Sequence, residues 1–271
     1  MKPLRNRLTW QRRLRRSFWV IGDRLSVIGY RLSVIGDRLS SPVVGCHLPL
    51  TDYRLPLTDY RLPFTDYRLP FTGMWAIVPV KELANSKSRL AAVLSAEERA
   101  ALTRRLLRRT LGVLGQAPGV AGIFVVSRDT AVTQIAAACG AIPLAEKAGA
   151  GLNGAIRLGL QKAAVLGASQ ALILPSDLPF LRVEDVAVMG DISSPAILIA
   201  SDRSGTGTNA LRLPLPTEFW VQYGRNSYPK HLAEARRLNS PIHTITSPTL
   251  QFDLDTPQDW REFVTQEVQL L

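Results

Sequence analysis

The alternation of apolar and polar residues changes at Met74. From there onward, short apolar runs alternate with longer stretches in which apolar residues recur at helical spacing, and Ser95 with Glu98 forms a capping box at the start of one such stretch. This pattern predicts an α/β fold, in which a mostly parallel central sheet carries helices on both faces. The expected strands are residues 75–80, 123–127, 141–144, 171–174, 196–200, 209–213 and 250–254, and the expected helices are residues 96–114, 131–139, 152–166, 183–189, 228–238 and 257–268.

Residues 1–73 have a different pattern, in which two short units, Arg-Leu-Ser-Val-Ile-Gly and Thr-Asp-Tyr-Arg-Leu-Pro, recur within residues 23–70. Recurring proline excludes a coiled coil, and units of seven residues are too short to stack as a solenoid, whose repeats need about twenty residues. We interpret residues 1–73 as a low-complexity leader that is disordered or absent from the native protein, and residues 74–271 as the folded domain. The hypothesis is that translation starts at Met74. The alternative is a leader that binds an anionic membrane or nucleic acid through its arginines and tryptophans.

Charge and composition narrow the function classes. The net charge is +11, but residues 1–73 hold 13 of the 33 Lys and Arg and only 5 of the 22 Asp and Glu, so the basicity is concentrated in the leader. We therefore expect no nucleic-acid partner for the domain. No run of about eighteen apolar residues occurs, which predicts no membrane association. Two cysteines and three histidines without ligand spacing argue against a disulfide framework or a zinc cluster and favour the cytoplasm.

Polar residues placed directly after strands are the candidates for chemistry, because ligands of open α/β sheets bind at the carboxyl ends of the strands. After the first expected strand, Lys81, Lys87 and Arg89 occur together with Ser86 and Ser88. Cations and backbone N–H groups of this kind hold a triphosphate, although the stretch has neither a Walker A nor a dinucleotide-binding pattern. An ordinary solvated loop is the alternative at this position.

Acidic residues follow two other expected strands. Asp177 stands between Pro175 and Pro179, where it can ligate a divalent cation or, less simply, cap the following helix. Asp253 and Asp255 lie in the expected strand 250–254 and directly after it, and an extended chain places them on one face. Asp255 or Thr256 can alternatively cap the last helix. Carboxylates at the ends of two strands, together with a cationic loop, indicate magnesium-assisted nucleotidyl transfer.

Two further loops suit a second anion. Gly205 and Gly207 stand among small hydroxyl residues that run to Thr208 and Asn209, and Ser227 begins the expected helix that follows Tyr223-Gly-Arg-Asn. Glycine lets backbone amides approach an anion closely, and helix N-termini attract phosphate or carboxylate. Each feature alone is also an ordinary loop or cap, but together they indicate an anionic co-substrate.

These motifs, taken in order, resemble a known family. Pro79-Val-Lys, Lys87-Ser-Arg-Leu, Gly151-Leu-Asn, Pro175-Ser-Asp-Leu-Pro, Gly205-Thr-Gly-Thr-Asn, Tyr223-Gly-x-x-Ser and Phe252-Asp-Leu-Asp-Thr-Pro are similar to the guanylyltransferases of coenzyme F-420 biosynthesis. The resemblance covers residues 74–263 and implies a Rossmann-like nucleotidyltransferase fold. It also implies transfer of GMP from GTP to phosphoenolpyruvate or 2-phospho-L-lactate, with Mg²⁺ as cofactor.

The resemblance implies a role for each matching residue. Asp177, Asp253 and Lys87 are then the catalytic residues, and Asp177, Asp253 and Asp255 the magnesium ligands. The residues implied to bind GTP are Lys81, Lys87, Ser88, Arg89, Gly151 and Asn153, and those implied to bind the acceptor are Thr208, Gly224 and Ser227. A molybdopterin or sugar-phosphate nucleotidyltransferase on the same scaffold is the alternative enzyme, a basic protein acting through its leader is the alternative that is not an enzyme, and a homodimer is expected.

Overall fold

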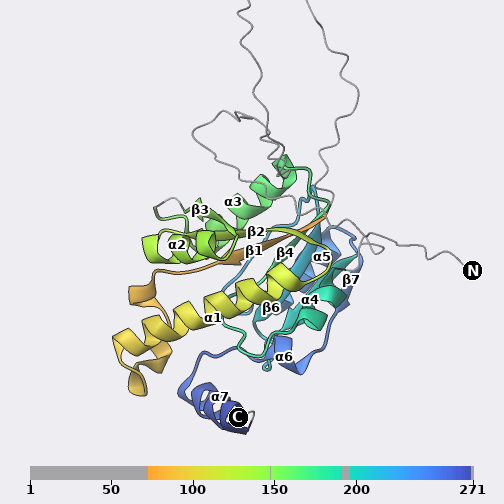
Figure 1. Ribbon diagram of the computed structural model, residues 1–271. Helices are drawn as coiled ribbons and strands as arrows, with labels where there is room; N and C mark the ends of the chain where they lie inside the picture. The colour runs from red at the N-terminus through yellow and green to blue at the C-terminus, as the bar shows by residue number, and fades with distance from the viewer. Residues whose placement is uncertain (1–72, 147, 191–195, 270–271) are drawn as a thin grey trace, which may run out of the picture. The chain divides into compact units, whose positions relative to one another are not determined.

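The computed structural model describes residues 73–146, 148–190 and 196–269, which form a seven-stranded sheet with helices on both faces (Figure 1). Of the predicted leader, residues 1–73, only Gly73 lies within the described residues. The strands are β1 (Met74–Pro79), β2 (Val120–Ser127), β3 (Ile142–Ala145), β4 (Gln170–Ile173), β5 (Ile197–Ser201), β6 (Thr208–Pro214) and β7 (Ile242–Thr244). The α-helices are α1 (Ala96–Gln116), α2 (Thr130–Ala138), α3 (Gly151–Val165), α4 (Val183–Met189), α5 (Ser227–Arg237), α6 (Pro248–Gln251) and α7 (Pro257–Gln269), and two 3₁₀ turns, Leu83–Asn85 and Ser88–Ala92, follow β1.

The sheet is mostly parallel, as predicted. The strand order is β3-β2-β1-β4-β6-β5-β7, and only the pairings of β6 with β4 and with β5 are antiparallel. Because β6 runs against its neighbours, its first residues lie beside the carboxyl ends of β4 and β5. The pairing of β5 with β6 also shifts register: Ala200 faces Ala210 whereas Ser201 faces Thr208, so Asn209 is an extra residue in β6.

The two faces of the sheet bury two apolar clusters, because alternate residues of a strand point to opposite sides. From β1, Ala76 and Val78 pack with apolar residues of α1, α2 and α4, whereas Ile77 packs with α3 and α5 on the other face. Figure 1 shows α1, in yellow, crossing one face of the sheet. The predicted capping box of Ser95 and Glu98 starts α1. A cap of this kind stabilises a helix by about 1 kcal/mol.

The prediction of a strand over residues 250–254 is wrong. Residues 248–251 form the single turn α6, and the chain from Phe252 to Asp255 runs without strand pairing. Pro248 explains the turn, because proline at the first position of a helix has its φ angle already set and leaves no N–H group unsatisfied. Phe252 and Leu254 are nevertheless buried, in a cluster with Leu90 and side chains of α1 and α7.

Strand β7 has no counterpart among the predicted elements. It pairs with β5 at the edge of the sheet and is only three residues long. None of the helices within the described residues combines the length and apolarity needed to cross a membrane.

Candidate active site

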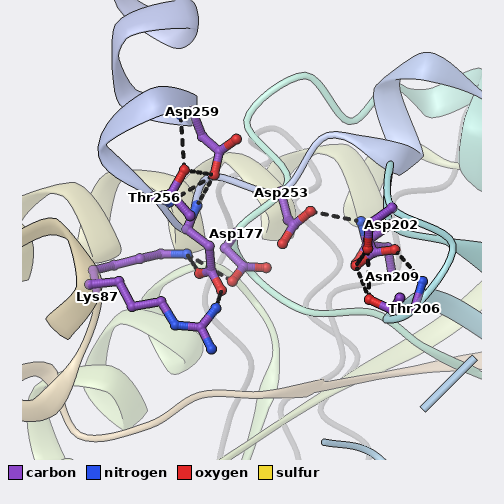
Figure 2. Close-up of polar contacts among 11 residues, drawn as sticks. Lys87, Asp177, Asp202, Thr206, Asn209, Asp253, Thr256 and Asp259 are labelled. Carbon is purple, nitrogen blue, oxygen red and sulfur yellow. Dashed lines mark hydrogen bonds and ion pairs between the residues drawn. The ribbon is translucent and has the colours of Figure 1, made fainter. Parts of the chain in front are cut away.

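Three segments meet at the carboxyl edge of the sheet: the loop after β1, the loop after β4, and residues 252–255. The N–H of Leu254 donates a hydrogen bond to the backbone oxygen of Asp177 over 3.0 Å, which joins the second segment to the third. Because Phe252 and Leu254 are buried, the acids that alternate with them face the edge of the sheet. Figure 2 shows Asp177 and Asp253 close together, as the sequence predicted.

Lys87 lies at the centre of this acidic group. Its Nζ is 2.8 Å from Oδ2 of Asp177 and 3.1 Å from Oδ1 of Asp255, and its side chain is only 7% exposed. Burial by itself would lower the pKa of the Lys87 ammonium, but the two carboxylates together raise it above its ordinary value. Lys87 therefore carries its charge throughout the neutral range and neutralises part of the acidic group.

The backbone holds Lys87 in an unusual conformation. Its φ of 50° and ψ of 38° lie in the left-handed region, which residues with a side chain rarely adopt and which is found most often at functional sites. The loop before it is fixed by buried contacts, since the hydroxyl of Ser86 donates to the Leu83 oxygen and accepts from Thr103. The Ser86 side chain thus has a structural task and is not free to bind phosphate.

Asp253 carries the least compensated charge of the group. Burial, with smaller contributions from Asp177 and Asp255, raises its pKa to about 6. The Asn209 amide, from the extra residue of β6, donates to Oδ1 of Asp253 over 3.4 Å and to the Leu250 oxygen over 2.9 Å. Asn209 thus orients Asp253, a role that the sequence analysis missed although Asn209 ends a quoted motif.

The acidic group fits a divalent cation in its chemistry. Carboxylate oxygens are the ligands that Mg²⁺ prefers, and Mg²⁺ is usually held by one or two carboxylates together with substrate phosphates. Within the described residues Asp253 forms no ion pair, and burial raises its pKa, whereas Lys87 already pairs with Asp177 and Asp255. Among the described residues, no three Asp, Glu, His or Cys side chains form a metal-binding group by themselves.

Asp255 lies beside cations. Besides Lys87, its carboxylate faces Arg89, whose Nη1 is 3.5 Å from Oδ2. Asp255 is not the cap of α7 either, because the Thr256 hydroxyl accepts the Asp259 N–H and the Asp259 carboxylate accepts the Thr256 N–H. Thr256 is thus the cap, one of the two alternatives that the sequence left open.

Of the other residues assigned to GTP, Arg89 contacts this group through Asp255, and the rest, which are all among the described residues, lie around it without a hydrogen bond or ion pair to it. Lys81, Ser88 and Arg89 are exposed, and within the described part of the chain Lys81 forms no ion pair. Gly151 begins α3 with a φ of +62°, a conformation that suits glycine. The Asn153 amide is held by the main chain of Tyr223: Oδ1 accepts the Tyr223 N–H at 2.8 Å, and Nδ2 donates to the Tyr223 oxygen at 3.0 Å.

Of the residues assigned to the acceptor, Thr208 and Ser227 are buried, and Gly224 is exposed. Thr208 begins β6, Ser227 begins α5, and Gly224 lies in the loop before α5 with a φ of +122°. The Oγ1 of Thr208 is 3.0 Å from Nδ1 of His231, which lies one helical turn after Ser227. Because Thr208 and Asn209 are adjacent, the start of β6 connects the buried network of Thr208 and His231 with the acidic group. His231 was not predicted to take part; its spacing of four residues from Ser227, on one helix face, is the signal that points to it.

Comparison with known proteins identifies the family. A sequence profile described as "Guanylyl transferase CofC like" matches residues 74–267. The chain belongs to this family. As a member of it, the chain is a nucleotidyltransferase, in agreement with the sequence prediction.

Two curated relatives bear on the substrate. A phosphoenolpyruvate guanylyltransferase of Rubrobacter xylanophilus is 40% identical over 188 residues, which are 69% of this chain and 91% of the relative. A 3-phospho-D-glycerate guanylyltransferase of Phenylobacterium zucineum is 36% identical over 190 residues, which are 68% of this chain and 86% of the relative.

A solved structure bears on the fold alone. A nucleotidyl transferase from Methanothermobacter thermautotroptrophicus is 12% identical, with a TM-score of 0.54 over 73% of this chain and 99% of the other. Its fold is therefore similar to that of the domain described above.

Proposed function

We propose that this enzyme transfers GMP from GTP to phosphoenolpyruvate and releases pyrophosphate, as a step in coenzyme F-420 biosynthesis. The observation that carries the proposal is the approach of Asp177, Asp253 and Lys87 at one edge of the sheet, next to the buried network of Thr208. The names of the relatives support phosphoenolpyruvate as acceptor. One relative is named for 3-phospho-D-glycerate, which makes that acid the second candidate. We retain 2-phospho-L-lactate as a third.

The charges of the reactants determine the mechanism. An oxygen of the acceptor phosphate attacks the α-phosphorus of GTP, the bond to the leaving pyrophosphate breaks, and a phosphoanhydride forms. Both reactants are anions, so Lys81, Lys87 and Arg89 would reduce their repulsion at the triphosphate. Mg²⁺ held by Asp177 and Asp253 would supply further charge neutralisation, with Asp255 beside them.

The remaining residues position the two substrates. In this proposal Ser88, Gly151 and Asn153 lie along the nucleotide, and Thr208, Gly224 and Ser227 bind the phosphate and carboxylate of the acceptor. No general base is required, because the attacking phosphate oxygen is already ionised near neutral pH. GTP and a phosphorylated three-carbon acid are metabolites of the cell interior, so we place the enzyme in the cytoplasm.

The test is an acceptor panel with the purified full chain and Mg²⁺. GTP, CTP and ATP are each combined with phosphoenolpyruvate, 2-phospho-L-lactate, 3-phospho-D-glycerate and a sugar phosphate, and pyrophosphate release is measured. We expect the highest kcat/KM for GTP with phosphoenolpyruvate. Turnover only with the sugar phosphate, or no turnover with any three-carbon acid, would contradict the proposal.

The variant Asp177→Asn tests the catalytic assignment in the same assay. Loss of one carboxylate charge should reduce kcat by about two orders of magnitude or more, the size expected when a transition-state electrostatic contact is removed. Asparagine retains an oxygen that can accept from Lys87, so we expect the fold to persist, as judged by circular dichroism. Turnover close to that of the wild type would refute the role of Asp177.

A further inference from the structure

His231 is the most buried polar residue near the proposed acceptor site, with no exposed surface. Both of its ring nitrogens have partners. The Gln222 N–H donates to Nε2 over 2.9 Å, and Nδ1 faces the Thr208 hydroxyl at 3.0 Å. Because Nε2 accepts a hydrogen bond, it carries no proton. The neutral ring must then carry its proton on Nδ1, and this N–H donates to Oγ1 of Thr208.

The surroundings of His231 keep the ring neutral. Burial lowers its pKa to about 4, although Glu234 opposes the shift and Lys230 adds to it. The carboxylate of Glu234 is itself engaged, because it accepts from Arg237 and from the Trp220 N–H. At neutral pH the assignment of the proton to Nδ1 therefore holds.

This assignment determines what the Thr208 hydroxyl can do. A hydroxyl has one proton to donate and can accept hydrogen bonds through its oxygen. Since Oγ1 accepts from His231, the Thr208 proton is left for another partner, and the described residues provide no acceptor for it. Thr208 is thereby prepared to donate to an anion.

The second bond of His231 acts on the loop before α5. It fixes the N–H of Gln222, and the Asn153 amide fixes both the N–H and the oxygen of the next residue, Tyr223. Gly224 follows directly, so its backbone amide is placed by these contacts. Ser227 and His231 lie four residues apart on the buried face of α5.

We propose that His231 is a positioning residue for the acceptor anion: it leaves the proton of the Thr208 hydroxyl to be donated to that anion and holds the loop that presents Gly224. This inference rests on the proposed function. It predicts that loss of His231 weakens acceptor binding and leaves GTP binding unchanged, because its contacts lie in the acceptor network.

The test is a double-mutant cycle with His231→Phe and Thr208→Val, assayed by pyrophosphate release from GTP and phosphoenolpyruvate. Phenylalanine retains a ring but removes both hydrogen bonds. We expect His231→Phe to raise the KM for phosphoenolpyruvate about tenfold, with the KM for GTP within about twofold of wild type. The KM for phosphoenolpyruvate of the double variant should rise by less than the product of the rises in the two single variants, because His231 acts on the acceptor partly through Thr208.

Phe219→Leu is the matched control, because Phe219 packs against the His231 ring with centroids 5.7 Å apart but makes no hydrogen bond to it. Its acceptor KM should equal that of the wild type. If His231→Phe does not fold, His231→Asn keeps a donor near the position of Nδ1 and lacks the Nε2 acceptor, so it should also raise the KM for phosphoenolpyruvate.

The outcomes separate this inference from the proposed function. An inactive wild type would overturn the proposed function. An active wild type with an unchanged acceptor KM in the folded His231 variant, equal rises in both KM values, or fully multiplicative effects in the cycle would overturn the role of His231.

Discussion

Burial shifts the pKa values of Asp253 and His231 in opposite directions, because it disfavours the charged form of each group. The pKa of Asp253 rises from 3.8 to about 6. Its contribution to stability is therefore complete below pH 3.8 and is lost as the pH rises to about 6. The pKa of His231 falls from 6.5 to about 4. Its contribution to stability is therefore present above pH 6.5 and is lost as the pH falls to about 4. Between these limits the two effects oppose each other.

The variant Asp253→Asn should therefore change how stability depends on pH. Without the Asp253 carboxylate, the effect of His231 is unopposed, and the free energy of unfolding should rise with pH between 4.5 and 6.5 more steeply than in the wild type. At pH 7.5 the variant should be more stable by about 1 to 2 kcal/mol, with solvent screening of this partly exposed group taken into account.

Denaturant unfolding of both proteins across this pH range, without Mg²⁺ or GTP, measures the difference. Asn209 can still donate to the amide oxygen of the variant, so the contact with β6 is retained. Parallel stability curves for the two proteins would contradict the raised pKa of Asp253.

Part of the site could be predicted from single residues. The position of Asp177 follows from its place after a strand of the sheet, whereas Asp253 approaches it although the strand predicted to carry Asp253 is absent. The pairing of Lys87 with Asp177 and Asp255 does not follow, because several cations lie within reach along the same loop and only the three-dimensional arrangement selects one. The tautomer of His231 likewise depends on a backbone N–H from a loop that has no sequence signature.

At the scale of elements, helix α3 is tied to the loop before α5 by one side chain. The Asn153 amide makes two hydrogen bonds to the main chain of Tyr223. Asn153→Ala leaves both Tyr223 groups without these partners and should lower the free energy of unfolding by about 1 to 3 kcal/mol.

Equilibrium denaturation measures this loss. The matched control is Gln161→Ala, an exposed position on the same helix, which should leave stability almost unchanged. Equal stability of the Asn153 and Gln161 variants would show that the link between α3 and the loop contributes nothing.

The elements that the sequence predicted best are helices. Helix α4 has the predicted bounds, and α1 and α5 begin within one residue of prediction. The failures are short: the one-turn helix α6 was interpreted as part of a strand, and β7 was missed. In both places a few apolar residues lie between polar ones, and such a stretch fits either structure until its tertiary partners are known.

At the scale of the whole molecule, the boundary at Met74 is the main open prediction. The family match begins at residue 74, and residues 1–72 of the leader that precedes it lie outside the described residues. We expect a chain that starts at Met74 to show the kcat and acceptor KM of the full chain, because every site residue follows that position.

The comparison requires both proteins in the same pyrophosphate assay, with vesicles of anionic lipid and duplex DNA as binding controls. Loss of turnover on truncation would contradict this prediction, and loss of association with vesicles or DNA would favour the alternative role for the leader. Mass spectrometry of the native N-terminus tests the start site directly, and peptides from residues 1–73 would disprove it.

The irregular pairing of β6 constrains how the loop before it can change. In a regular strand, neighbouring side chains point to opposite faces. The extra residue changes this alternation relative to the rest of β6, so that Thr208 contacts His231 of α5 while Asn209 contacts Asp253. Deleting one residue at this irregular pairing would restore regular pairing between β5 and β6, and one of these two side chains would lose its contact. The loop that leads into β6 is constrained as well, since Asp202 accepts the Thr206 N–H and Gly205 has a φ of +70°, and a single deletion at the start of β6 would uncouple the two halves of the substrate site.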